Sequence, residues 1–404
     1  MLGTESILGR MKKTCNPRSS AGAAGSVALC LGAILSGAGL PAIGAEAPSL
    51  SPLERQFLGA PVQITEGAQK AGEGYFSPDA RTICYQAVPL GYPFYQIYVQ
   101  DFDPANPAPT PPRRVSTGRG RTTCSWFAPG GKRLLFASSH LDPEIDRTEA
   151  AARAQAEEDA RTGRRRRYQW DFDPHMEIFT ANLDGTDMVR LTNTPGYDAE
   201  CSFSPDGSRI LFVSDRDGDP DIYLMNADGS DVRQLTNAPG YDGGPFFSPD
   251  GRWITYRTDR VEKDLLQIHV MRADGSDDVA VTSGKGVRWA PYWHPTKPWL
   301  IWTGADHSDP TKRPNYDLWI AAYDLDGGRF RCGPPVRLTD HESADVLPVF
   351  SPDGSLLMWT ASRGGDGGGR GPASQLWASR VDTAAIATAL AAAAKAAGQE
   401  GRGP

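Results

Sequence analysis

The sequence lacks the marks of several classes of protein. It has 6 histidines among 404 residues and no two cysteines at C-x-x-C spacing, so we expect no metal site and no cofactor. The formal net charge of -7 leaves no basic excess for a nucleic-acid partner. No G-x-S-x-G sequence is present to form the nucleophile elbow of a serine hydrolase. Beyond residue 47, no stretch is long and apolar enough to cross a membrane.

Residues 1–47 have the composition of an export signal. A basic segment begins at Met11, which is an alternative start, an apolar segment follows at 21–40, and small residues suited to cleavage surround Ala45. We therefore predict a cleaved signal peptide, a periplasmic or secreted protein, and a linker over residues 48–60. The alternative is an uncleaved membrane anchor, because the apolar segment is close to the shortest spanning length.

Four cysteines follow the predicted cleavage site: Cys84, Cys124, Cys201 and Cys332. An oxidising compartment permits disulfides between them. Their spacing favours no particular pairing, and small buried thiols are the alternative. The sequence leaves both states open.

A five-residue string, FSPDG, occurs at 203–207, 247–251 and 350–354. Related strings place an aligned aromatic residue in six units, at Phe76, Phe127, Phe203, Phe247, Trp293 and Phe350. The shortest spacing, about 44 residues, is typical of propeller blades. The clearest unit, Phe203–Thr236, contains four short alternating strands joined by turns. FSPDG is thus predicted to be a turn between two strands, and its aspartates to stabilise that turn.

A second anchor, an aliphatic residue followed by a hydroxyl residue, ends each unit. It occurs at Thr65, Ser116, Thr192, Thr236, Thr282 and Thr339, each 11 residues before an aligned aromatic. The first anchor precedes the first unit, and the last unit lacks its own closing strand. We therefore predict an all-β, six-bladed propeller over residues 61–380, in which an N-terminal strand completes the last blade.

The repeat resembles the TolB-type family, also called WD40-like or PD40, whose signature is FSPDG followed by I-x-F-x-S and I-Y-x-M-x-x-D-G. The resemblance covers about residues 61–380 and is closest in the third and fourth units. It implies a six-bladed propeller and a protein-binding role. TolB has an α/β domain before its propeller, whereas here about fifteen residues separate the predicted signal from Pro61. The resemblance therefore leaves a partner on the propeller face, as with the peptidoglycan-associated lipoprotein.

The two faces of such a disc differ. The SPDG turns share one face, here called the turn face, and the other, the link face, carries the links between blades and the connections between second and third strands. Insertions gather on the link face, so we expect binding there. The predicted ligand- or partner-binding residues at the channel mouth are Asp198, Glu200, Asp242, Arg288, Asp345, His140, Arg216, Arg260, His307 and Arg363.

These residues suggest a charged mouth that recognises a cationic or hydroxyl-rich ligand. The alternative is structural: the aspartates and arginines pair to lock neighbouring blades. We expect no catalytic residue and no metal ligand among them. The string DRDGDPD at 215–221 resembles a calcium loop, but no bidentate acid follows at the required spacing, so a plain hairpin is predicted.

Two segments interrupt or follow the repeats. The insertion at 141–168 is predicted to form a solvated helix with Asp142 as its N-cap, Pro143 at its first position, and ion pairs from Glu149 to Arg153 and from Glu157 to Arg161. It would overhang the rim as a lid or arm, and the basic run at 164–167 is most simply a solvated surface. The alanine-rich tail, 381–404, predicts a loosely docked helix.

The sequence as a whole predicts a monomeric, exported, non-catalytic binding module whose partner is an envelope protein or a saccharide. The alternative is a polysaccharide lyase or hydrolase of the oligogalacturonate lyase type, acting at the channel mouth, because that family uses similar repeats with channel histidines that hold a metal. His140 and His307 are at comparable depths in their units, but no tight histidine cluster can be assembled from the sequence.

Overall fold

The fold is taken from a computed structural model of the whole chain, which describes residues 49–164, 172–309, 311–326, 328–363 and 373–400. The predicted export signal and residues 165–168 of the insertion lie outside the described residues. None of the helices in these ranges is long and apolar enough to cross a membrane.

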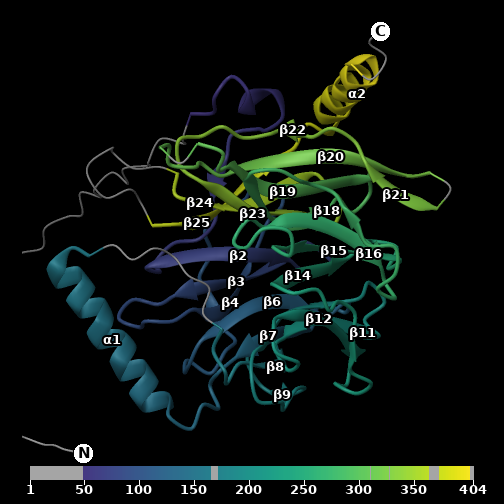
Figure 1. Cartoon of the computed structure of the whole chain (residues 1–404). Coiled ribbons are helices and arrows are strands. Elements are labelled where there is room, and N and C mark those ends of the chain that lie inside the picture. Colours follow the sequence, from purple (N-terminus) through teal and green to yellow (C-terminus); the bar gives the residue numbers. More distant parts are fainter. Residues whose placement is uncertain (1–48, 165–171, 310, 327, 364–372, 401–404) are drawn as a thin grey trace, which may run out of the picture. The chain divides into compact units, whose positions relative to one another are not determined.

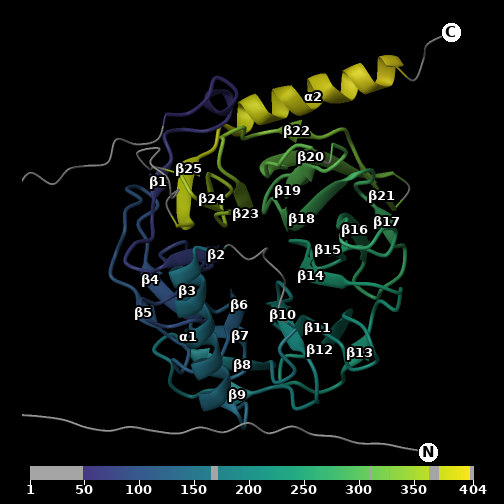
Figure 2. The ribbon, with the colours of Figure 1, turned by 60° about the vertical axis from the view of Figure 1, so that its left-hand side comes forward.

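The strands form six antiparallel sheets, which follow one another around a ring (Figures 1 and 2). Blade one contains β2 (Lys70–Phe76), β3 (Thr82–Val88), β4 (Gln96–Asp101) and β5 (Arg113–Arg114). Blade two contains β6 (Thr122–Phe127), β7 (Arg133–Ser138), β8 (Glu177–Asn182) and β9 (Val189–Arg190). Blade three contains β10 (Asp198–Phe203), β11 (Arg209–Ser214), β12 (Asp221–Asn226) and β13 (Arg233–Gln234).

The remaining blades repeat this order. Blade four contains β14 (Asp242–Phe247), β15 (Trp253–Thr258), β16 (Gln267–Arg272) and β17 (Val279–Ala280). Blade five contains β18 (Gly286–Trp293), β19 (Trp299–Asp306), β20 (Asp317–Asp326), β21 (Arg329–Cys332) and β22 (Val336–Arg337). Blade six contains β23 (Asp345–Phe350), β24 (Leu356–Ala361) and β25 (Gln375–Arg380), and its fourth strand is β1 (Val62–Gln63). The prediction of an all-β, six-bladed propeller is confirmed.

The N-terminal strand closes the ring as predicted. Val62 pairs with Ala378 and Gln63 with Trp377 in an antiparallel register. The Thr65 hydroxyl accepts a hydrogen bond from the Leu376 amide at 2.9 Å and donates one to the Gln375 side chain at 2.8 Å. The two ends of the propeller are therefore joined by main-chain and side-chain hydrogen bonds, and β25 is not an open sheet edge.

The FSPDG strings are the turns between the first and second strands of their blades. In blade three, the Ser204 hydroxyl donates to Asp206 at 2.6 Å, and the Gly207 amide donates to the Ser204 carbonyl at 2.9 Å. Gly207 has a φ of 73°, which a glycine adopts at no steric cost. Asp206 thus stabilises its own turn by accepting local hydrogen bonds.

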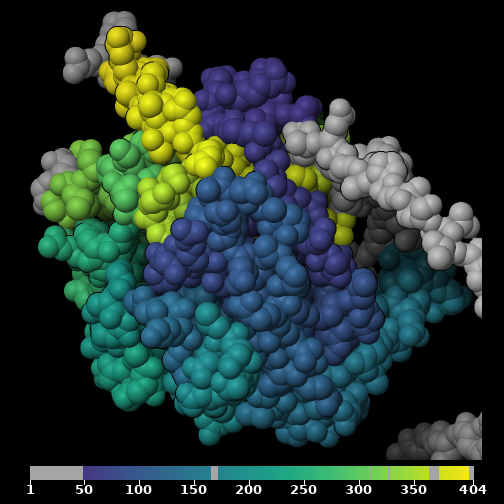
Figure 3. Space-filling view, turned by 180° about the vertical axis from the view of Figure 1, so that it is seen from behind, coloured from purple at the N-terminus to yellow at the C-terminus, as the bar shows by residue number. Residues whose placement is uncertain are grey.

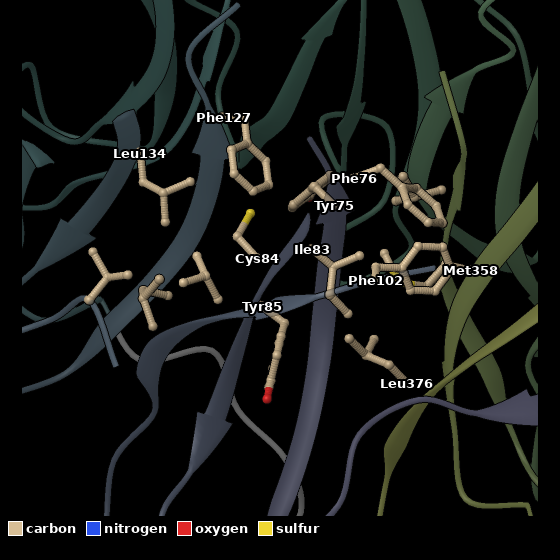
Figure 4. Packing of buried hydrophobic residues seen from close by; sticks show 14 of the residues in the cluster. Tyr75, Phe76, Ile83, Cys84, Tyr85, Phe102, Phe127, Leu134, Met358 and Leu376 are labelled. Carbon is tan, nitrogen blue, oxygen red and sulfur yellow. The ribbon is translucent and has the colours of Figure 1, made fainter. Parts of the chain in front are cut away.

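The core lies between neighbouring blades. Figure 4 shows Phe76 and Ile83 of blade one between Phe127 of blade two and Met358 and Leu376 of blade six. All of these side chains are buried, and each contributes about 1.5–3 kcal/mol by leaving water. The apolar core is thus divided into several clusters, most of which join neighbouring blades.

The insertion in blade two forms helix α1 (Ile145–Thr162), between β7 and β8. It begins two residues later than an N-cap at Asp142 would place it, and the Asp142 carboxylate instead accepts hydrogen bonds from the Glu144 amide at 2.8 Å and the Thr148 hydroxyl at 2.9 Å. Arg153 pairs with Glu149 at 3.2 Å as predicted. Arg161, however, pairs with Glu158 at 2.7 Å rather than with Glu157.

Helix α1 is also anchored more firmly than a fully solvated arm. Glu149 is buried and accepts hydrogen bonds from the Tyr92 hydroxyl at 2.8 Å, Arg119 Nε at 2.8 Å and the Gly120 amide at 3.1 Å. One face of the helix is therefore fixed to the surface at the junction of blades one and two.

The C-terminal helix α2 (Thr383–Glu400) leaves the propeller after β25, beside the N-terminal segment (Figure 3). Ile386 and Leu390 are buried in a cluster with Phe57, Trp359 and other apolar residues of blades five and six. The helix beyond Leu390 is mostly exposed. Its first half is thus docked, and the prediction of loose docking describes only the second half.

Candidate functional site

Each inner strand carries a β-bulge at the same place. The residue at the bulge has a positive φ, between 47° and 59°, in all six blades. The pairing with the second strand shifts at each of these positions. The bulge residues are Glu73, Cys124, Glu200, Gly244, Ala290 and Leu347. Such a repeated bulge re-aims one residue per blade towards the axis of the ring.

These six residues line one cavity of about 270 Å³ in the propeller channel. Its lining also includes Tyr95 and Ser374, which lie in the connections between second and third strands of blades one and six. The cavity therefore extends from the bulges towards the link face.

Four aromatic residues close the channel on the turn-face side of the bulges: Tyr75, Trp126, Phe246 and Tyr292. The ring centroids of Tyr75 and Trp126 are 4.7 Å apart, and those of Phe246 and Tyr292 are 5.7 Å apart. Each residue immediately precedes the aligned aromatic of its blade. They form an aromatic floor, and their spacing is that of favourable ring contacts.

Glu200 is the centre of a charged cluster in this cavity. Its carboxylate accepts hydrogen bonds from Arg257 Nη2 at 2.8 Å and from the Tyr241 hydroxyl at 2.6 Å, and Arg257 also donates to the Tyr241 hydroxyl at 2.7 Å. The Arg257 guanidinium lies 5.9 Å from the centre of the Trp289 ring. Glu200 is buried, so its charge is balanced by a partner from the next blade.

Glu73 occupies the equivalent place in blade one but has weaker partners. Its carboxylate accepts a hydrogen bond from the Tyr75 hydroxyl at 3.4 Å, and its amide donates to the Thr360 hydroxyl at 3.0 Å. Burial raises the pKa of Glu73 to about 7, and the nearby charge of Glu200 adds to the rise while Arg257 and Cys124 oppose it. Glu73 is thus a carboxyl group that has no salt-bridge partner among the described residues and can change its charge near neutral pH.

Two thiols also line the cavity, those of Cys124 and Cys201. All four cysteines of the described residues, Cys84, Cys124, Cys201 and Cys332, are free thiols. Burial raises the pKa of the Cys124 and Cys201 thiols well above the usual value. Both thiols are therefore protonated and are poor nucleophiles at neutral pH.

The predicted aspartates and arginines form pairs beside the cavity. Asp198, Asp242 and Asp345 begin the inner strands of blades three, four and six and are 1%, 0% and 0% exposed. Arg216 pairs with Asp198 at 3.0 Å and Arg260 with Asp242 at 2.8 Å. Arg363 Nε donates to Asp345 at 2.9 Å. Each pair joins the first strand of a blade to the connection after its own second strand, so the pairs brace single blades rather than neighbouring ones.

The other predicted residues have local partners. His140 Nδ1 lies 3.0 Å from the Ser138 hydroxyl, and its ring packs on Phe179 with 4.5 Å between centroids. His307 Nε2 lies 3.1 Å from the Tyr316 hydroxyl, in blade five. Arg288 is half-buried at the start of β18, and its Nη1 donates to the Ala305 carbonyl at 3.4 Å. The two histidines lie in different blades, and burial lowers the pKa of His140.

Of the ten predicted residues, Glu200 lines the cavity, and the other nine are not among the described residues that do. Arg257, Tyr241 and Trp289 were not predicted. The sequence could have indicated Arg257, because a charged residue stands there where the equivalent positions of the second strand hold Ala137 in blade two and Val213 in blade three. The sequence could also have indicated Tyr241, because the string GYD occurs at the start of the inner strands of both blade three and blade four.

The one group of acids that could hold a metal ion in the described part of the chain lies outside this cavity. It consists of Asp217, Asp219 and Asp221, whose carboxylate oxygens lie within 4.8 Å of one another. The spacing and the oxygen ligands suit a hard divalent cation rather than zinc.

Comparisons with known proteins agree with the fold. Residues 169–237, which include the last two strands of blade two and all of blade three, match the TolB beta propeller domain family. No curated protein sequence matches the chain significantly.

Several solved structures resemble the chain at low identity. A TolB candidate from Agrobacterium tumefaciens has a TM-score of 0.47 and 20% identity, over 77% of this chain and 90% of its own. TolB from Acinetobacter baumannii has a TM-score of 0.45 and 17% identity, over 79% of this chain and 65% of its own, which is less than two thirds of its length. An oligogalacturonate lyase from Vibrio parahaemolyticus has a TM-score of 0.49 and 13% identity, over 80% and 81%. At these TM-scores the likenesses carry no argument about function. The family match confirms a TolB-type repeat in residues 169–237, and the six sheets confirm the predicted propeller.

Proposed function

We propose that the protein is an exported, non-catalytic binding module of the cell envelope, and that its ligand enters the channel cavity from the link face. The observation that carries this proposal is the Glu73 carboxyl group, which lines a preformed cavity and has no salt-bridge partner in the described part of the chain. Polar groups held ready in a mostly apolar, concave site are typical of ligand recognition.

The chemistry of the cavity favours a ligand with a cationic or hydrogen-bond-donating end. Glu73 offers a carboxylate, and Tyr75, Phe246 and Tyr292 offer aromatic surface beneath it. A carboxylate beside aromatic rings binds ammonium and guanidinium groups through charge and cation–π attraction. A cavity of about 270 Å³ is small, so it suits one side chain or a chain end of a larger partner.

A binding role fits the reactivity of the lining better than catalysis does. The raised pKa of Cys124 and Cys201 keeps both thiols protonated. His140 and His307 lie in blades two and five and face their own hydrogen-bond partners. The described residues thus offer no histidine cluster of the kind that a metal-dependent lyase of this repeat type would need.

The test is affinity capture from envelope extract with three immobilised proteins: the wild type, Glu73→Gln, and Glu66→Gln as a control at an exposed position. We expect the partner on the wild type and on the control, and its depletion by about tenfold or more on Glu73→Gln, because a charge-assisted hydrogen bond is lost. Equal recovery on all three proteins would contradict the proposed site.

The lyase alternative is tested on the same wild-type protein. It is incubated with acidic polysaccharides, and unsaturated products are followed by their ultraviolet absorbance, with and without added divalent metal. We expect no product above the background rate. Product formation that is lost in a His140→Ala, His307→Ala variant would replace the binding proposal by the enzymatic one.

A further inference from the structure

The first residue of the third strand is a buried acid in three blades. These residues are Glu177, Asp221 and Asp317, at the starts of β8, β12 and β20. In each case the next blade begins its inner strand with another buried aspartate: Asp198, Asp242 or Asp345. The three blade junctions therefore each contain two acids that are out of contact with bulk water, and such charges require compensation.

In two of the three junctions, an arginine of the outer strand supplies this compensation. Arg190 pairs with Glu177 at 2.6 Å, and Arg337 pairs with Asp317 at 2.7 Å. In both blades the strand partner of the arginine is the residue two positions after the acid, Phe179 for Arg190 and Trp319 for Arg337. In blade three the same register holds Gln234, opposite Tyr223. Its neutral amide donates to Asp221 at 3.1 Å but brings no positive charge.

The junction of blades three and four gains further negative charge instead. The connection before β12 places Asp217 and Asp219 so that their carboxylate oxygens and those of Asp221 lie within 4.8 Å of one another. The exposure of the three acids increases from the buried Asp221 to the exposed Asp217, so the group opens to solvent on one side.

A second and independent observation comes from Asp242 of the next blade, which is 0% exposed. Its amide donates to the Pro220 carbonyl at 2.8 Å, so it lies against the acidic connection. Arg260 bonds one carboxylate oxygen at 2.8 Å, but the other, Oδ1, has no hydrogen-bond partner among the described residues.

The equivalent aspartates are satisfied. Both oxygens of Asp198 accept from Arg216, at 3.1 and 3.0 Å. In Asp345, Oδ1 accepts from Trp359 Nε1 at 3.0 Å and from Arg363 Nε at 2.9 Å, and Oδ2 accepts from Arg363 Nη2. A buried carboxylate oxygen that lacks a partner in one of three equivalent places indicates a missing ligand, such as an ion.

We propose that Asp217, Asp219 and Asp221 bind a calcium ion at the junction of blades three and four, where the arginine of the other junctions is absent. Calcium accepts carboxylate oxygens in a flexible geometry and completes its coordination with water. The cation compensates the buried charge of Asp221, beside the inner strand that Asp242 begins. This site departs from the plain hairpin that the sequence predicts for residues 215–221, because three acids of that hairpin meet beside a buried acid of the next blade.

The test uses the full chain, freed of metal by a chelator, and follows both calcium titration by calorimetry and the melting temperature. We expect saturable binding of one calcium ion and a rise in melting temperature with calcium concentration. Asp219→Asn should weaken calcium binding by about tenfold or more. Asp228→Asn, at an exposed turn of the same blade, serves as the control and should keep the calcium response.

The decisive variant is Gln234→Arg, which places at this junction the guanidinium that Arg190 and Arg337 supply elsewhere. We expect it to fold, to melt without calcium at or above the temperature of the calcium-free wild type, and to lose the calcium response. The proposal is overturned if the wild type shows neither heat nor a melting shift up to about 10 mM calcium, well above the weak range of extracellular sites. It is also overturned if Gln234→Arg binds calcium as the wild type does.

Discussion

Glu73 and Glu200 stand at the same bulge of different blades, yet their surroundings give them different roles. Glu200 accepts hydrogen bonds from Arg257 and Tyr241, so its charge is neutralised within the protein. Glu73 faces the same cavity with the Tyr75 hydroxyl at 3.4 Å. The repeat therefore fixes where a side chain points, and the side chains of neighbouring blades decide whether its charge remains available to a ligand.

The raised pKa of Glu73 makes stability depend on pH. The folded protein holds this proton up to about pH 7, whereas the unfolded chain releases it near the ordinary value of 4.5. Stability from this group is therefore full below about pH 4.5 and falls as the pH rises towards 7. We expect the free energy of unfolding of the wild type to fall by about 1–3 kcal/mol relative to Glu73→Gln between about pH 5 and pH 8. Urea denaturation measures this difference, and parallel pH profiles for the two proteins would contradict it.

The pair formed by Asp345 and Arg363 is predicted to stabilise the fold rather than to bind a ligand. Both side chains are fully buried, and Arg363 also bonds Glu54 in the N-terminal segment. Asp345→Ala leaves a buried guanidinium with one carboxylate fewer, so we expect a loss of about 3–5 kcal/mol in the free energy of unfolding.

The control is Asp324→Ala, at an exposed position of blade five, for which a change within about 0.5 kcal/mol is expected. Urea denaturation of both variants tests the prediction. If Asp345→Ala is no less stable than the control, the pair is not a structural brace, and Asp345 returns to the list of ligand-binding candidates.

Helix α1 is held on the propeller surface by the contacts of one buried residue. Its sequence contains almost no large apolar residue, which is why it reads as a solvated arm. The anchor is instead Glu149, which accepts hydrogen bonds from Tyr92, Arg119 and Gly120. No helical periodicity marks that residue, because the three donors come from blade one and from the link between blades one and two.

We expect Glu149→Gln to loosen α1 without unfolding the propeller. The amide keeps a hydrogen-bonding group but loses the charge that Arg119 pairs with, so local opening should become easier by about 1–3 kcal/mol. Limited proteolysis should then cut within residues 145–162 at least several times faster than in the wild type. Glu157→Gln, exposed on the same helix, should leave the cleavage rate unchanged. Equal cleavage of both variants would show that α1 is held by other contacts.

The six-fold repeat explains which parts of the whole molecule the sequence could predict. Strand order, the SPDG turns and the closing N-terminal strand follow from residues that recur at fixed spacing. The charged cluster does not, because Glu200 and Arg257 are 57 positions apart and meet only after blades three and four are packed. The pairing of Asp198 with Arg216 within one blade, rather than between blades, likewise depends on how far each connection folds back over its own inner strand.

Ring closure leads to a prediction for the whole molecule. β1 supplies the fourth strand of blade six, and Ile64 and Thr65 continue its contacts with β25. A chain that begins at residue 66 would expose an unpaired edge on β25 and open the apolar core between blades six and one. We expect this chain to melt at a markedly lower temperature and to aggregate, whereas a chain that begins at residue 49 should melt cooperatively, because it keeps β1 and the contacts of Thr65 with β25.

A peptide of residues 49–65 distinguishes lost closure from general damage. Because strand addition supplies the same main-chain hydrogen bonds in trans, the peptide should bind the shortened chain, raise its melting temperature and suppress its aggregation. A matched peptide with Ile64→Asp and Thr65→Pro should do neither, since Ile64 is fully buried and the Thr65 hydroxyl joins Gln375 and Leu376. If the shortened chain is as stable as the longer one, the ring does not depend on β1, and its cohesion comes from the packing between blades alone.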